Sequence, residues 1–284
     1  MRALPYLVFL GLGTAGLGGW YKFQHLKPKT LQEYLEWQGF KLLSHSEENH
    51  WKAVLEENKD LLSKLGISTS HSGEVKSWCE RNLNSESYEE LVDVAPLLCV
   101  DNIRTVKGRI IQIAGDTSKL IQTGGQEANQ YKVAYVFRKH IDGFHALIGY
   151  SPEVDEGKEI EDLDKAHQAF KTWCNDSLDK PINEALAQNV MALCTPKGFS
   201  TIEELIKRNG ETLLTETSQS TALKEKYEKI KELDSWKNEN QNSKSNEEDL
   251  KSWCDENKAK NFYDENVFSE VYPKFRFRCL KLEE

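Results

Sequence analysis

The chain repeats one rare dipeptide three times, and this repeat constrains its fold more than any other feature of the sequence. The dipeptide is Trp-Cys, and its copies are Trp78-Cys79, Trp173-Cys174 and Trp253-Cys254. An apolar residue, a lysine and a serine or threonine precede each copy. Because both residue types are rare, three matching copies indicate internal repeats, which are the signature of tandem structural units.

The six cysteines fall into three pairs, because one further cysteine follows each Trp-Cys dipeptide. The separations are 20, 20 and 25 positions in the pairs Cys79/Cys99, Cys174/Cys194 and Cys254/Cys279. Outside the cytoplasm such pairs form disulfide bonds, and closing a loop of about 20 residues stabilises a fold by about 3 kcal/mol. We therefore predict three structural disulfide bonds, each covered by the tryptophan next to it.

Two other interpretations of the cysteines stay open. Six reduced cysteines would act as small buried hydrophobic residues. A structural zinc site favours closely spaced cysteines, and the sequence contains no C-x-x-C motif.

His140 and His145 lie five positions apart, which we interpret as a surface loop with histidines. We therefore predict no metal site.

A threonine followed by apolar residues opens each repeat. The openers TLQEYL at 30–35 and TIEELI at 201–206 are followed, at the same spacing, by a glycine and then by two leucines. A weaker copy starts at Thr105 and includes Ile110 and Ile111. The sequence therefore predicts three tandem helical units, at residues 30–100, 101–195 and 196–284.

Helical spacing of apolar residues dominates these units, so the predicted fold class is mainly α. Thr30 with Glu33, and Thr201 with Glu204, match the capping box that starts a helix. The last unit ends in VYPKFRFRCLKL, where apolar and charged residues alternate as they do in a half-buried strand. We therefore allow for short strands near the C-terminus.

The N-terminal residues 3–21 form one long apolar run without a charge. As a helix, 19 residues span about 28 Å, which is close to the thickness of a bilayer core. Trp20 and Tyr21 lie at its end, as in an interfacial aromatic belt. Residues 1–24 are therefore predicted to be a single membrane-spanning anchor, with the lipid bilayer as its partner.

Three alternatives bear on this segment. A signal peptide cleaved near Ala15 would make the protein secreted. A buried core helix is disfavoured by five glycines in the run. The motif G-x-G-x-x-G at 11–16 would bind a dinucleotide only between a strand and a helix, and here it lies inside the apolar run. The flanking charges, Arg2 against three lysines, leave the orientation open.

Charge and motifs narrow the function. The net charge of -9 argues against broad nucleic-acid binding, which needs clustered cations. The sequence lacks G-x-S-x-G, a Walker loop and H-E-x-x-H. We therefore predict a protein that is not an enzyme and uses no cofactor. The alternative is a membrane-tethered enzyme or solute-binding subunit, which requires one deep pocket with convergent polar groups.

Three features together carry a resemblance to a known group of proteins. They are the apolar segment GLGTAGLGG, the T-x-x-E-Y-L opener at 30–35 and the K-x-W-C helix with its later cysteine. In these features the chain resembles the uncharacterised paralogous membrane-associated protein families of haemotropic mycoplasmas. The middle unit departs from the pattern, because Lys107-Gly108 replaces the Glu-aromatic part of its opener.

This resemblance implies a location and a general role, and it transfers no site residue. It implies a membrane-associated protein that acts as a surface antigen. Together with the apolar run and the cysteine pairs, it predicts a single-pass protein of the cell membrane with an extracellular soluble part. Its role would be host contact or antigenic variation, with a host-cell surface protein as partner.

Overall fold

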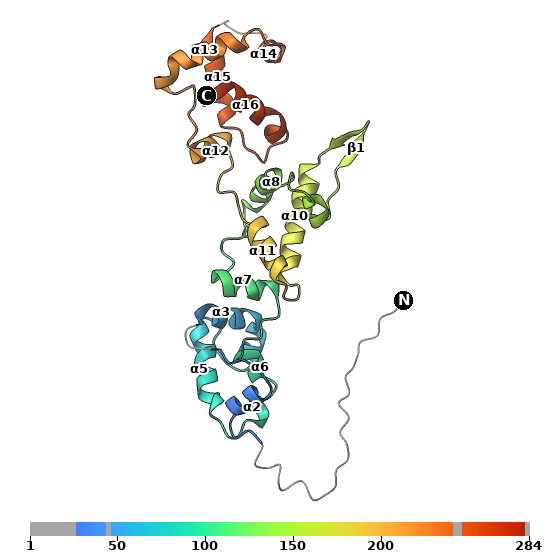
Figure 1. Ribbon diagram of the computed structural model, residues 1–284, viewed down its shortest axis with the longest axis vertical. Coiled ribbons are helices and arrows are strands. Elements are labelled where there is room, and N and C mark those ends of the chain that lie inside the picture. Colours follow the sequence, from blue (N-terminus) through green and yellow to red (C-terminus); the bar gives the residue numbers. More distant parts are fainter. Residues whose placement is uncertain (1–26, 44–46, 241–245, 282–284) are drawn as a thin grey trace, which may run out of the picture. The chain divides into compact units, whose positions relative to one another are not determined.

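The computed structural model describes residues 27–43, 47–240 and 246–281 (Figure 1). These residues are mainly helical, which confirms the predicted fold class. The predicted membrane anchor at 1–24 lies outside them. Within the described residues, no helix has the length and hydrophobicity needed to cross a bilayer. The chain divides into two compact units, 1–103 and 104–284.

The first unit is built from short helices around one buried core. They are α2 (Leu31–Trp37), α3 (Glu48–Glu57), α4 (Lys59–Lys64), α5 (Ser72–Leu83), the 3-10 turn η2 (Glu89–Leu91) and α6 (Ala95–Leu98). Helix α2 begins where Thr30 accepts a hydrogen bond from the Glu33 backbone amide, at 3.2 Å. The predicted box is incomplete in this opener, because the Glu33 carboxylate accepts from the Lys29 amide instead. Helix α3 packs against α5, and Leu35, Val54 and Val75 are among the buried residues.

The second unit contains the remaining helices and a small hairpin, and one continuous hydrophobic cluster runs through it. Its first elements are α7 (Val106–Ala114), α8 (Glu127–Val136), α9 (Phe144–Ile148), β1 (Glu153–Asp155), β2 (Lys158–Ile160), α10 (Leu163–Leu178) and α11 (Glu184–Leu193). Its last elements are α12 (Ile202–Asn209), η3 (Thr217–Gln219), α13 (Ser220–Ile230), α14 (Asp234–Glu239), α15 (Glu247–Lys258), the π-helical turn η4 (Val267–Val271) and α16 (Tyr272–Cys279).

The opener of α12 has the predicted start and end. Thr201 accepts from the Glu204 amide, and the Glu204 side chain accepts from the Thr201 amide, so the capping box is complete. Gly210 closes the helix with a left-handed φ of 69°, a conformation that glycine adopts without steric cost.

The strands allowed for near the C-terminus are wrong, because this segment is the helix α16. In a strand, Phe275, Phe277 and Cys279 would share one face. The structure instead buries Phe275 with Arg278 and Cys279, which is helical spacing, and leaves Phe277 49% exposed. The packing of one helical face therefore overrides the alternation of charges.

Among the described residues, the only β-sheet is the two-stranded hairpin of β1 and β2. Glu153 pairs with Ile160 and Asp155 with Lys158. In Figure 1 this hairpin projects away from α8 and α10. Val154 on it is 68% exposed.

Candidate functional site

The described residues contain three disulfide bonds, which confirms the prediction that the cysteines are oxidised. Each bond joins a Trp-Cys helix to the end of the next major helix along the chain. The pairs are Cys79–Cys99, Cys174–Cys194 and Cys254–Cys279. All six cysteines are buried. The disulfide bonds therefore fasten α5 to α6, α10 to α11 and α15 to α16.

A backbone hydrogen bond ties each opener to the residue six positions after the first cysteine of its pair. We call the three predicted repeats, 30–100, 101–195 and 196–284, the first, second and third segments. In each segment the first helical residue of the opener donates its amide to that carbonyl. The pairs are Leu31 to Ser85 at 3.1 Å, Val106 to Lys180 at 3.0 Å and Ile202 to Lys260 at 3.1 Å. The position after the Trp-Cys helix is therefore structurally equivalent in each segment.

A second backbone bond recurs at the closing cysteine, whose carbonyl accepts from an apolar residue that follows the opener. The pairs are Leu43 to Cys99 at 3.1 Å, Ile121 to Cys194 at 2.8 Å and Leu214 to Cys279 at 2.8 Å. In the middle segment the residue that matches Leu43 is therefore Ile121. It follows the opening threonine by 16 positions, whereas Leu43 and Leu214 follow theirs by 13, so the middle segment has three extra residues here.

A third bond is present in the outer segments and absent from the middle one, for a reason that the sequence supplies. Asp101 donates to the Lys41 carbonyl, and Lys281 donates to the Thr212 carbonyl. The equivalent position in the middle segment is Pro196, which has no backbone N–H. We call the two bonds that recur in all three segments, together with the disulfide bond, the repeat frame.

The three repeat tryptophans, Trp78, Trp173 and Trp253, are only half-buried. The Trp253 ring stacks on Phe275, with ring centroids 6.4 Å apart, and the Arg278 guanidinium lies 4.6 Å from its centroid. Trp173 stacks on Phe170. The rings of Trp173 and Trp253 thus pack at the edge of the aromatic core. The expected contact of each tryptophan ring with its neighbouring disulfide bond stays a prediction.

The residue four positions after each tryptophan differs in its hydrogen bonding. Asn82 donates to the Trp78 carbonyl and Asn257 to the Trp253 carbonyl, both at 2.7 Å. The middle segment has Ser177 at this position, and its hydroxyl is buried without a hydrogen-bond partner in the described part of the chain. A buried hydroxyl without a partner costs free energy.

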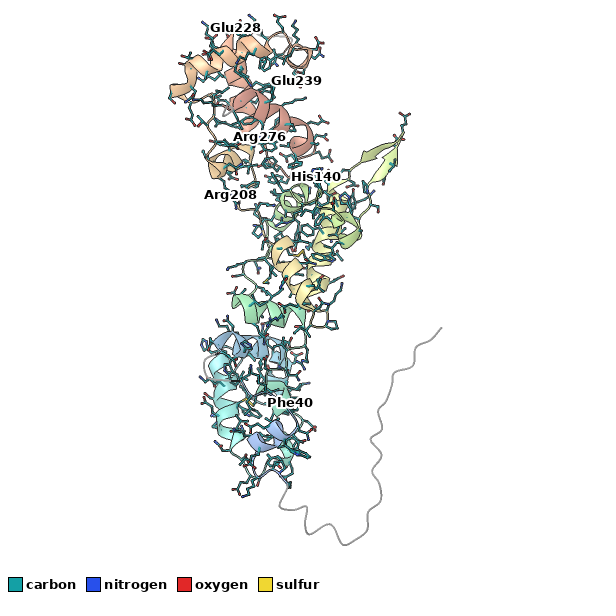
Figure 2. All side chains as sticks on the ribbon, viewed as in Figure 1. Phe40, His140, Arg208, Glu228, Glu239 and Arg276 are labelled. Carbon is teal, nitrogen blue, oxygen red and sulfur yellow. A yellow bond between two sulfur atoms is a disulfide. The ribbon has the colours of Figure 1, made fainter. Side chains whose placement is uncertain are left out.

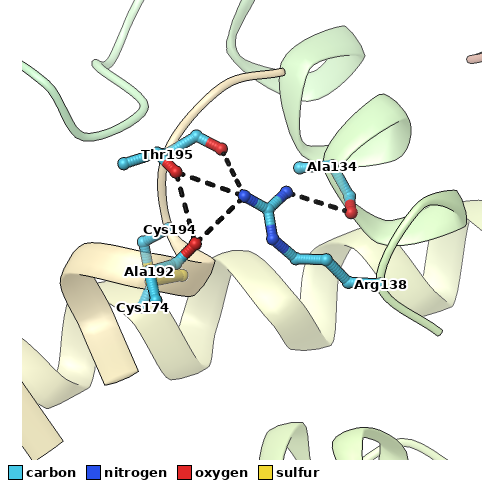
Figure 3. The surroundings of a disulfide bond; sticks show 6 residues. All are labelled: Ala134, Arg138, Cys174, Ala192, Cys194 and Thr195. Carbon is cyan, nitrogen blue, oxygen red and sulfur yellow. Dashed lines mark hydrogen bonds between the residues drawn. A yellow bond between two sulfur atoms is a disulfide. The ribbon is translucent and has the colours of Figure 1, made fainter. Parts of the chain in front are cut away.

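Arg138 follows α8 and is only 5% exposed, although no carboxylate pairs with it within the described ranges. Its guanidinium donates to the carbonyls of Ala134 at 3.2 Å, Ala192 at 3.2 Å and Thr195 at 3.0 Å (Figure 3). Burial lowers the pKa of Arg138 to about 10. Since helix ends leave carbonyls without partners, Arg138 acts as a cap for the end of α11, where Cys194 lies.

Asn58 has the same role in the first unit. It donates to the Val54 carbonyl, four residues before it, at 2.8 Å, and to the Leu97 carbonyl at 3.1 Å. Leu97 lies two positions before Cys99, as Ala192 lies two positions before Cys194. Sequence reasoning missed both residues, because in the sequence Arg138 is followed directly by Lys139 and nothing marks it as the buried cation of the two.

A cleft of about 430 Å³ opens between α8 and the linker that leads from the second segment to the third. Amide, aromatic and charged side chains line it together. The lining residues are Gln126, Asn129, Gln130, Val133, Pro196, Lys197, Gly198, Phe199, Ser200, Glu204 and Tyr263. Its size lies within the range of about 300–1,000 Å³ that is typical of ligand pockets.

Two cations and one carboxylate, Lys197, Arg208 and Glu204, lie in or beside the cleft, and backbone groups provide hydrogen bonds to Arg208 and Glu204. Arg208, labelled on α12 in Figure 2, donates to the Lys197 carbonyl and lies 5.5 Å from the Phe199 ring centroid. Burial, and then the positive charges of Arg138 and Arg208, lower the pKa of Lys197. Backbone hydrogen bonds from Ser200 and Thr201 lower the pKa of Glu204, so its carboxylate stays ionised.

The two histidines singled out in the sequence are apart from this cleft. His145 lies in α9, and its Nε2 is 2.9 Å from the Tyr135 hydroxyl. His140 stacks on Phe268 and is exposed. Throughout the residues that the structure describes, no group of three or more histidine, cysteine, aspartate or glutamate side chains is placed to hold a metal ion.

Comparison of the chain with protein-family models, with curated proteins and with solved structures finds no match in any of the three.

Proposed function

We propose that the chain is a single-pass membrane-anchored surface protein whose disulfide-bonded helical region faces the cell exterior. The observation that carries this proposal is the set of three buried disulfide bonds. Disulfide bonds persist in oxidising environments and are rare in the cytosol. The apolar run at 3–21 is long enough to supply the anchor.

The organisation of the exterior region supports a role in contact rather than in catalysis. The repeat frame holds tandem helical modules whose solvent-facing residues are largely charged. Contact with a host-cell surface protein, or antigenic variation of these faces, is the function that suits such modules. The catalytic motifs named above are missing from the sequence.

Protease treatment of intact cells tests this proposal when it is followed by thiol labelling of the released fragment under denaturing conditions. The expected result is a released fragment that spans the modules and carries no free thiol. A chain that stays protected and labels at six thiols would place the modules in the cytoplasm and sink the proposal. Cells opened with detergent are the control for protease access.

A solute-binding subunit is the second candidate, and the cleft beside α8 is the observation that favours it. Pockets with a few convergent polar groups are the usual sites of small ligands. Both candidates share the same anchored arrangement, and they differ in whether the cleft is occupied during function.

A further inference from the structure

The cleft beside α8 has a wall of neutral amides. Gln126, Asn129 and Gln130 follow the spacing i, i+3, i+4, which places them on one side of the helix. Each amide offers two donors and one acceptor oxygen. A row of such groups matches a ligand with several hydroxyls, each of which can donate and accept.

The opposite wall carries a cation that lacks a counter-ion. Lys197 is half-buried, and among the described residues its ammonium group forms no ion pair. Its Nζ lies 5.7 Å from the Phe137 ring centroid. Arg138 and Arg208 repel it, and Arg138 has no carboxylate partner in the same ranges. Two guanidinium groups and one ammonium group therefore surround a linker of a few residues, and a bound anion would relieve their repulsion.

Glu204 is the one carboxylate that lines the cleft, and the backbone already engages it. Its Oε2 accepts from the Ser200 amide at 2.6 Å and from the Thr201 amide at 3.1 Å. It forms no ion pair with Lys197 within the structure's described residues. The charge of Glu204 is thus offset by the start of α12, which leaves Lys197 as the cation among the residues that line the cleft.

Aromatic rings complete the site. Phe199 and Tyr263 line the cleft, and Phe199 is held edge-on by Phe137 and Phe262, with ring centroids 5.1 and 5.9 Å apart. Aromatic faces pack against C–H groups, whereas the amides bind hydroxyls. We propose that this cleft binds an acidic sugar, whose carboxylate pairs with Lys197 and whose hydroxyls bind the amides of α8.

Titration calorimetry of the full chain with glucuronate tests the inference directly. The expected result is saturable binding of glucuronate, with glucose binding at least about tenfold more weakly because it lacks the carboxylate. Acetate is the second comparison, because it offers the charge without the hydroxyls. No binding of glucuronate would overturn the inference, and so would equal binding of glucose or of acetate.

Two matched variants locate the binding. Lys197→Gln should weaken glucuronate binding about tenfold or more while glucose binding stays unchanged. Lys207→Gln is the control, because Lys207 is an exposed cation on α12 that pairs with Glu203 outside the cleft. Asn129→Ala should weaken glucuronate and glucose together. Equal affinity of wild-type chain and a folded Lys197→Gln variant would overturn the assignment. This inference goes beyond the proposed surface location. Protease treatment with thiol labelling tests the location, calorimetry tests the ligand, and a negative result in one leaves the other hypothesis standing.

Discussion

In the first and second segments, side chains of different charge donate hydrogen bonds to the matching backbone carbonyls. Both must satisfy the carbonyl two positions before the closing cysteine, and both also bond the carbonyl four residues back in the preceding helix. The first segment uses the neutral amide of Asn58, and the second uses the guanidinium of Arg138. In these two segments the position therefore holds a hydrogen-bond donor, which is neutral in one and charged in the other.

The difference lies in what the longer side chain reaches. Asn58 donates to the carbonyls of Val54 and Leu97, which precede the closing cysteine, whereas Arg138 also reaches past the closing cysteine to the carbonyl and hydroxyl of Thr195, at 3.0 and 3.2 Å. Thr195 begins the linker that forms one wall of the cleft. The desolvation of Arg138, visible in its lowered pKa, is thus linked to the placement of this linker.

Removal of the disulfide bonds should produce the largest effect and should be equal in the two segments. Cys79→Ala with Cys99→Ala, and Cys174→Ala with Cys194→Ala, each open a loop of 20 residues. In the chain-entropy treatment each pair loses about 3 kcal/mol of unfolding free energy. Denaturant unfolding measures both values. Losses that differ by more than about 1 kcal/mol would show that the bonds hold the segments differently.

Truncation of the capping side chains should separate the two segments. Arg138→Ala should lower the unfolding free energy by about 2–3 kcal/mol, because it leaves buried carbonyls without charge-assisted bonds. Asn58→Ala should cost about 1–2 kcal/mol, because it removes two neutral bonds. Arg138→Ala should also loosen residues 195–200, which hydrogen exchange measures. Equal losses, with no change of exchange in the linker, would remove the distinction between the two caps.

The residue four positions after each repeat tryptophan provides a smaller comparison. Asn257→Ala should lower the unfolding free energy by about 1 kcal/mol, because it removes the bond to the Trp253 carbonyl. Ser177→Ala should leave stability unchanged or raise it slightly, since a buried hydroxyl without a partner is removed. Thermal unfolding of both variants measures the effect. A clear loss in the serine variant would show that its hydroxyl is satisfied in solution.

The smallest expected effect is on the dependence of the unfolding free energy on pH in acidic solution. The folded-state pKa of Glu204 lies below its ordinary value of 4.5, because backbone amides donate to its charged form. The stability from this carboxylate is therefore present above pH 4.5 and is lost as the pH falls through the lowered folded-state value. Glu204→Gln should make unfolding free energy less dependent on pH in this range. An unchanged pH profile would contradict the role of the capping box.

The sequence predicted the local features and missed the contacts between distant residues. The helix caps at Thr30 and Thr201 were predicted because they depend on neighbouring residues, and the structure adds a matching cap at Thr105. The cysteine pairs were predictable because one further cysteine follows each Trp-Cys dipeptide along the chain. Arg138 could not be assigned, because its acceptors at Ala192 and Thr195 lie more than 50 positions away. The C-terminal helix was missed because alternation along VYPKFRFRCLKL ignores which side chains the core of the second unit buries.

The part of each segment that varies most in length lies between the bond to the closing cysteine and the repeat tryptophan. From the residue bonded to the closing cysteine to the repeat tryptophan there are 35 positions in the first segment (43 to 78), 52 in the second (121 to 173) and 39 in the third (214 to 253). The longest stretch holds α9 and the β1–β2 hairpin. Because doubling a loop adds only about 0.6 kcal/mol of closure entropy, insertions here cost the fold little. A lineage of such chains can therefore alter its solvent-facing sequence at this place while the cysteines and the openers stay where they are.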